Sequence, residues 1–112
     1  MSDFFINAWN DMQRKVHSSC VTKGFWPEDK SQRNVGEAIA LIHSELSEGL
    51  EGHRKDLPDD HCPEFTSLEV ELADAVIRIL DLAGGLNLRV AEALVAKHTF
   101  NQSRPFRHGK KY

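Results

Sequence analysis

The sequence has no long apolar run. Its apolar stretches are all far shorter than the roughly 20 residues that a helix needs to cross a bilayer. The N-terminus also lacks the basic and apolar regions of a secretion signal. We therefore expect no membrane segment and a cytoplasmic protein.

Cysteine is scarce. Cys20 and Cys62 are the two cysteines of the chain, and neither belongs to a Cys-x-x-Cys pair, so we expect two reduced thiols. The six histidines do not provide a zinc-binding pair either, because none of them lies at the i, i+4 spacing of a helical metal site from another. His61 and Cys62 are adjacent, but they lie in a proline-containing segment. We therefore expect no structural zinc site.

Positive charge is also limited. The formal net charge is −3, so the chain lacks the overall basic character of proteins that bind duplex nucleic acid. Charge is nevertheless unevenly distributed, because the centre is acidic and the segment from Lys97 onward is basic. A basic tail beside an acidic site suits an anionic substrate that arrives with a cation.

Sustained alternation of polar and apolar residues is absent, so we expect no β-sheet. The 112 residues, 40% of them apolar, suffice for one domain with one core. Periodicity predicts helices over residues 2–20, 34–54, 68–83 and 87–101, with Gly84-Gly85 ending the third and Asn87 capping the fourth. We expect an all-α four-helix bundle of residues 1–112 with an extended basic tail at 104–112.

The first two predicted helices each carry an apolar stripe at helical spacing. These residues are the predicted core positions: Phe5, Trp9, Met12 and Val16 in the first helix, and Val35, Ile39, Ile42, Leu46 and Leu50 in the second. The second helix has further apolar residues, Ala38 and Leu41, off its stripe. A bundle this small buries one face of each helix, so the surplus predicts a homo-oligomer that completes or extends the bundle.

The third predicted helix is apolar almost all round, apart from one narrow polar stripe. Glu71, Asp74, Arg78 and Asp81 fall within roughly 80° of arc at 100° per residue. Carboxylates confined in this way must be paired, hydrogen-bonded or bound to a metal. We expect Arg78 to balance one acid and to pair with Asp81, which leaves Glu71 and Asp74 in need of another partner.

Two acidic pairs have the same spacing. Glu45 and Glu48 in the second predicted helix, and Glu71 and Asp74 in the third, each lie three residues apart. On packed neighbouring helices, four carboxylates would share one small volume and repel one another. A divalent cation removes this repulsion, and carboxylate ligation favours Mg²⁺, or alternatively Mn²⁺.

A second polar group is predicted at the end of the fourth helix. Lys97 and Asn101 share a helix face, and Arg104 follows at the start of the tail. Their ammonium, amide and guanidinium groups suit phosphate oxygens. The alternative is that these cations only complement the helix dipole.

Two further residues are candidate contacts to a nucleobase. Trp26 lies in a Gly-Phe-Trp-Pro loop and needs a partner surface, while His17 points away from the apolar stripe of the first helix. We expect His17 to contact a base or ribose or otherwise to be exposed. Trp9 fits the core stripe.

Three segments together resemble the MazG-like, all-α nucleoside triphosphate pyrophosphatases. They are Ile42-His43-Ser44-Glu45-Leu46-Ser47-Glu48, then Glu71-Leu72-Ala73-Asp74, then Lys97-x-x-x-Asn101-x-x-Arg104-Pro105. The resemblance spans roughly residues 34–109. It implies that Glu45, Glu48, Glu71 and Asp74 hold Mg²⁺ and that Lys97, Asn101 and Arg104 hold the triphosphate. It also implies cleavage of a nucleoside triphosphate to monophosphate and pyrophosphate, by a dimer or tetramer.

Chemistry then requires a group that orients the attacking water. Glu48 is our candidate and Glu45 the alternative, which the sequence does not separate. A di-iron carboxylate bundle is excluded, because such sites use Glu-x-x-His and this chain has none. A catalytically silent helical oligomerisation or regulatory module with an acidic cleft stays as the alternative function.

Overall fold

The computed structural model describes residues 2–112 and contains four helices, as predicted. The bounds are α1 Ser2–Thr22, α2 Val35–Arg54, α3 Ser67–Leu86 and α4 Val90–Gln102, with short 3₁₀ helices η1 at Lys30–Gln32 and η2 at Phe106–Gly109. Within these residues no strand forms, and the extended backbone is limited to an isolated bridge between Pro58 and Thr66. The all-α fold class is therefore confirmed. No helix in residues 2–112 has the length and hydropathy needed to cross a membrane.

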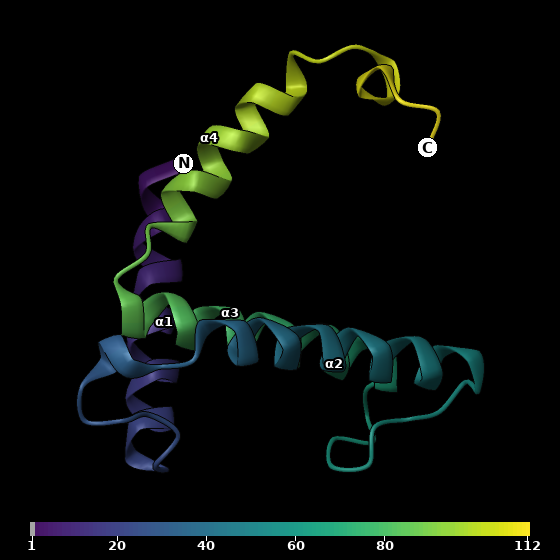
Figure 1. The fold of residues 1–112 in the computed structure, drawn as a ribbon. Coiled ribbons are helices and arrows are strands. Elements are labelled where there is room, and N and C mark those ends of the chain that lie inside the picture. Colours follow the sequence, from purple (N-terminus) through teal and green to yellow (C-terminus); the bar gives the residue numbers. More distant parts are fainter. Residues whose placement is uncertain (1) are drawn as a thin grey trace.

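Helices α2 and α3 form an antiparallel pair, and α1 crosses one end of it (Figure 1). Both helices of the pair begin with a side-chain cap. The Asn34 side chain accepts from the Glu37 N–H at the start of α2, while Thr66 and Glu69 form a reciprocal capping box at α3. Helix α4 packs mainly against α1 and leads away from the α2–α3 pair.

The predicted end of the third helix is wrong. Helix α3 continues through Gly84 and Gly85 and ends at Leu86, with Asn87 as its C-cap in a left-handed conformation with φ of 56°. Asn87 therefore closes α3 instead of capping α4. The two glycines serve close packing, because a Cβ at Gly84 would lie 2.7 Å from His17 Cβ and one at Gly85 would lie 2.1 Å from Trp26 Cη2. The tail after Pro105 is not wholly extended either, since it contains η2.

Most residues of the predicted core stripes are exposed in the single chain, although Trp9, Val16 and Ile42 are half-buried. In α1, His17 is the buried residue, whereas Phe5 and Met12 are exposed. In α2, Val35, Ile39, Leu46 and Leu50 are exposed. The side of α2 that is buried instead carries small residues and one acid: Ala38, Glu45, Gly49 and Gly52. Periodicity identifies an apolar stripe correctly, but it does not specify whether the same chain or another one covers that stripe. Cys20 and Cys62 are both free thiols, as predicted.

Candidate metal centre

The contact between α2 and α3 is a seam of small residues, which brings carboxylates together. A Cβ at Gly49 would lie 3.2 Å from Glu71 Cβ, and one at Gly52 would lie 2.1 Å from Ser67 Oγ. Side chains larger than hydrogen at these two positions would separate the helices. The glycines therefore hold Glu71 of α3 close to the backbone of α2, on the side that also carries Glu45.

Three of the four predicted metal ligands come together. Glu45, Glu71 and Asp74 each offer one carboxylate oxygen, and these oxygens lie within 4.8 Å of one another. Two unit charges at that separation repel by about 3.5 kcal/mol at an effective dielectric constant of 20. The fourth predicted ligand, Glu48, is exposed on α2 and lies outside this group of three. Its carboxyl group is one of the causes that raise the pKa of Glu71.

Arg78 neutralises part of this negative charge. Its Nε donates a hydrogen bond to Glu45 Oε1 at 2.9 Å. Burial opposes the ionisation of Glu45, but hydrogen bonds with Glu71 and Arg78 prevail and lower the pKa of Glu45 below its ordinary value. Arg78 therefore balances one acid, as predicted.

The other two acids resist ionisation when no cation is bound. Burial, followed by the neighbouring Glu45 and Glu48 carboxyl groups, raises the pKa of Glu71 to about 8. Burial and the charge of Glu45 likewise raise the pKa of Asp74. At neutral pH the cluster thus holds a proton that a bound cation would displace.

The donor set fits a hard divalent cation. All three candidate donors are carboxylate oxygens, which Mg²⁺ and Mn²⁺ prefer. Glu71 Oε2 is buried, and within residues 2–112 it has no hydrogen-bond partner. A cation would supply the interaction that this oxygen otherwise lacks.

A cleft of about 660 Å³ joins the carboxylates to the end of α1. Its walls come from α1, the loop after it, α2 and α3. The residues lining it are Cys20, Gly24, Phe25, Arg33, Glu37, Leu41, Glu45, Asp74, Ile77, Arg78 and Asp81. This volume lies within the range of clefts that bind small organic molecules.

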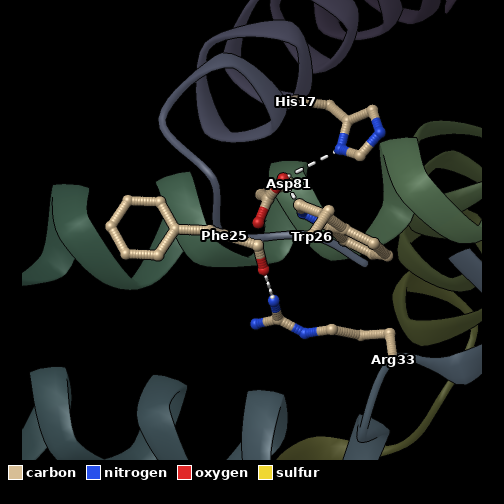
Figure 2. A network of polar contacts seen from close by, with 5 residues as sticks. All are labelled: His17, Phe25, Trp26, Arg33 and Asp81. Atoms are coloured by element: carbon tan, nitrogen blue, oxygen red, sulfur yellow. Dashed lines mark hydrogen bonds and ion pairs between the residues drawn. The ribbon is translucent and has the colours of Figure 1, made fainter. Parts of the chain in front are cut away.

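The far end of the cleft is built on Asp81 (Figure 2). Asp81 Oδ1 lies 2.9 Å from His17 Nδ1 and accepts a hydrogen bond from Trp26 Nε1 at 2.8 Å. The prediction that Asp81 pairs with Arg78 is therefore wrong, because Arg78 bonds to Glu45 on α2. The acids of the α3 stripe therefore have different partners. Glu71 and Asp74 lie with Glu45 of α2, whereas Asp81 contacts His17 of α1.

His17 and Trp26, the two predicted base contacts, lie beside each other in this network. Their rings meet edge to face, with centroids 4.8 Å apart, and the Arg33 guanidinium lies 4.9 Å from the centroid of Trp26. Arg33 is held there by a hydrogen bond to the Phe25 carbonyl oxygen (Figure 2). His17 is buried rather than exposed, so that alternative was wrong. The role of Asp81 was missed, although its place on the polar stripe was visible in the sequence.

The predicted phosphate-binding residues form a separate cluster at the end of α4. Arg104 Nη1 donates to Asn101 Oδ1 at 3.4 Å, and both Lys97 and Arg104 approach the Phe100 ring. Because α4 leads away from the α2–α3 pair (Figure 1), one chain does not gather this cluster with its own carboxylates.

Comparison with protein families, curated proteins and solved structures found no match to this chain. The resemblance of its three motifs to MazG-like pyrophosphatases therefore stays a prediction from the residues.

Proposed function

We propose that this protein is a Mg²⁺-dependent pyrophosphohydrolase that cleaves a nucleoside triphosphate to its monophosphate and pyrophosphate. The observation that carries the proposal is the convergence of Glu45, Glu71 and Asp74, of which Glu45 and Asp74 also line a cleft of about 660 Å³. The pool of nucleoside triphosphates lies in the cytoplasm, and we place the activity there.

In this proposal Glu45, Glu71 and Asp74 hold Mg²⁺, or Mn²⁺, with Glu48 completing the set. The cation would offset negative charge on the phosphate oxygens and acidify a bound water. Hydrogen bonds with Glu71 and Arg78 lower the pKa of Glu45, so one ligand carries its charge before a cation arrives.

Glu48 is our candidate for orienting the attacking water. It lies outside the group of three oxygens, whereas Glu45 is engaged by Arg78. An exposed carboxylate that is not fully engaged by the metal can accept a proton from water as that water attacks phosphorus. This difference in surroundings favours Glu48 over Glu45.

Lys97, Asn101 and Arg104 bind the triphosphate in this proposal and stabilise the departing pyrophosphate. Because α4 leads away from the carboxylates of its own chain, we assign these residues to the site of another subunit. The enzyme is then a homo-oligomer whose sites are shared between chains.

The nucleobase would occupy the end of the cleft near Asp81. The Trp26 indole and the His17 ring form hydrogen bonds with Asp81, which orients them without substrate. Neither ring lines the cleft itself, whereas Asp81 does, so their proposed role as base contacts rests on the sequence pattern.

The test is incubation of the purified protein with each common ribo- and deoxyribonucleoside triphosphate in Mg²⁺ or Mn²⁺. We expect equal amounts of pyrophosphate and nucleoside monophosphate, separated by ion-exchange chromatography. Glu71→Gln should abolish the products, whereas Glu28→Gln, an exposed loop change, should not. If wild-type protein consumes no triphosphate with either cation, the silent oligomerisation module replaces the enzyme.

A further inference from the structure

A second cleft, of about 570 Å³, lies between α1 and the junction of α3 with α4. We call it the junction cleft. It shares no lining residue with the cleft that adjoins the candidate metal centre. Three cations and one acid line the junction cleft, whereas four acids and two cations line the other: the three cations are Arg14, Lys30 and Arg89, and the acid is Glu92. The junction cleft therefore favours an anionic ligand.

The cations of the junction cleft have little charge compensation. Within residues 2–112, neither Lys30 nor Arg89 forms an ion pair. Arg14 lies 3.6 Å from an Asp11 carboxylate oxygen, but Lys15 contacts the same carboxylate at 2.9 Å. An anion bound between these side chains would supply the partner that they lack.

Helix α4 begins at this cleft without a side-chain cap. Its N-cap residue Arg89 forms no capping hydrogen bond, whereas Asn34 and Thr66 cap α2 and α3. The first N–H groups of a helix have no acceptor within the helix and carry partial positive charge. Because Leu88, Arg89 and Glu92 all line the cleft, these N–H groups lie at its edge. Phosphate oxygens are well suited to such a helix start.

His17 presents a buried ring nitrogen to the same cleft. It is 8% exposed, and its Nδ1 lies 2.9 Å from the Asp81 carboxylate. An ionised carboxylate only accepts hydrogen bonds, so Nδ1 carries the proton and Nε2 of the neutral ring is an acceptor. Figure 2 shows the second ring nitrogen on the side turned away from Asp81. Since Asp81 lines the other cleft and His17 lines this one, Nε2 is directed toward the junction cleft.

Two acceptors that line the junction cleft are therefore unsatisfied. Within residues 2–112, neither His17 Nε2 nor Glu92 Oε1 has a hydrogen-bond partner, and both atoms are buried. A buried acceptor without a donor is energetically costly. Hydroxyl groups on a bound molecule would supply the missing donors. The cleft thus combines features that suit a phosphate with features that suit hydroxyl groups.

We infer that the junction cleft binds a phosphorylated sugar, either free or as part of a nucleotide. The phosphate lies at Lys30, Arg89 and the start of α4, and sugar hydroxyls donate to His17 Nε2 and Glu92 Oε1. The inference goes beyond the proposed function, because the cleft contains none of the proposed metal ligands or triphosphate-binding residues.

The first test measures binding in EDTA, which leaves the candidate metal centre without a cation. Ribose 5-phosphate, adenosine monophosphate, inorganic phosphate and ribose are each titrated into the wild-type protein by isothermal titration calorimetry. We expect ribose 5-phosphate to bind about 10-fold more tightly than inorganic phosphate, because its hydroxyl groups add hydrogen bonds. Tighter binding of adenosine monophosphate than of ribose 5-phosphate assigns the ligand as a nucleotide; equal or weaker binding assigns it as a free sugar phosphate.

Substitutions then separate the two parts of the ligand. Lys30→Gln/Arg89→Gln removes two cations and should weaken the binding of inorganic phosphate and of ribose 5-phosphate at least about 10-fold. The matched control Arg54→Gln/Lys55→Gln, at the exposed end of α2, should leave both affinities unchanged. Glu92→Ala removes one acceptor for the sugar and should reduce the preference for ribose 5-phosphate over inorganic phosphate.

Nuclear magnetic resonance locates the ligand without any substitution. On addition of ribose 5-phosphate in EDTA, the backbone amide signals of residues 88–92 should shift more than those of Glu45, Glu71 and Asp74. The inference is overturned if neither phosphorylated sugar binds, if ribose 5-phosphate binds no better than inorganic phosphate, or if the shifts are confined to the acidic seam. Equal affinities of Lys30→Gln/Arg89→Gln and its control would also overturn it. None of these measurements depends on hydrolysis of a triphosphate.

Discussion

Arg78 Nε donates to Glu45 Oε1 at 2.9 Å, across the seam that joins α2 to α3. The arginine side chain is 39% exposed and the glutamate side chain 11%. This pair is the one ionic contact described among the acids of the candidate metal centre. Glu45, which makes it, has a lowered pKa, whereas the pKa values of Glu71 and Asp74 are raised. A bound cation and Arg78 would thus act on the same negative charge.

Arg78→Gln should lower stability more in EDTA than in saturating Mg²⁺. Without a cation, Glu45 loses its neutralising partner, and we expect a loss of about 1–2 kcal/mol, reduced by the partial exposure of Arg78. With Mg²⁺, the cation replaces part of that charge. Thermal denaturation followed by circular dichroism measures both differences.

The matched control is Arg14→Gln, which removes an exposed arginine beside Asp11. Its effect should stay within 0.5 kcal/mol and be independent of Mg²⁺, as for most surface pairs. Equal losses from Arg78→Gln in EDTA and in Mg²⁺ would argue against a cation at this seam.

Glu71 should make the cation-free protein less stable as pH rises. Its pKa is about 8 in the folded chain and near its ordinary 4.5 when unfolded. Between these values the folded state holds a proton that the unfolded state has lost, so stability declines from about pH 4.5 to about pH 8.

Glu71→Gln keeps the shape of the protonated group but cannot ionise, so it should remove this decline. We expect the melting temperature in EDTA at pH 8 to exceed that of wild type by about 5 °C, with little difference at pH 5. The control Glu28→Gln should follow wild type at both values. A parallel decline in wild type and Glu71→Gln would assign the pH dependence to other groups.

Mixed oligomers test whether Lys97 and Arg104 serve another subunit. We expect Glu71→Gln and the double variant Lys97→Ala/Arg104→Ala each to be inactive alone. Mixed at equal amounts and allowed to exchange, they should recover about one quarter of wild-type activity, because half of random dimers contain both chains and each of these has one intact site.

Sites formed within one chain would predict a different result. Every site in the mixture would then carry one of the defects, and activity would stay at background. Chains labelled with two affinity tags and recovered together provide the necessary check that exchange took place.

Gly85→Ala should destabilise the fold, although alanine favours helix more than glycine does. The added Cβ would lie 2.1 Å from Trp26 Cη2, so Trp26 must move and lose its hydrogen bond to Asp81. We expect a net loss of about 2 kcal/mol in urea denaturation followed by tryptophan fluorescence.

Gly36→Ala, in the first turn of α2, is the matched comparison. Its added Cβ would meet Asn34 Oδ1 at 3.5 Å, an ordinary contact, so helix propensity should dominate and stability should rise by up to about 1 kcal/mol. If Gly85→Ala stabilised the protein as much as Gly36→Ala, the close packing of Trp26 on α3 would be contradicted.

The sequence by itself determined where most helices begin and which acids are neighbours. Helical periodicity and the caps at Asn34 and Thr66 are local properties, and local hydrogen bonds decide them. The spacing of the acids on two consecutive helices likewise predicted that Glu45, Glu71 and Asp74 meet, but it also predicted Glu48 in this group, which the structure leaves outside. The predicted end of the third helix at Gly84 was wrong, because a glycine can either end a helix or allow a neighbouring segment to pack closely. The sequence does not distinguish the two roles.

Only the tertiary structure decided which side of each helix is buried and which partner each polar group has. The glycines of α2 and α3 allow close helix contacts, so the seam lies on the side of small residues and carboxylates, and the apolar stripe of α2 is left outside. His17 and Asp81 are 64 positions apart in the chain, and no local pattern specifies that they meet. Periodicity states which residues share a face; packing between distant segments determines what that face contacts.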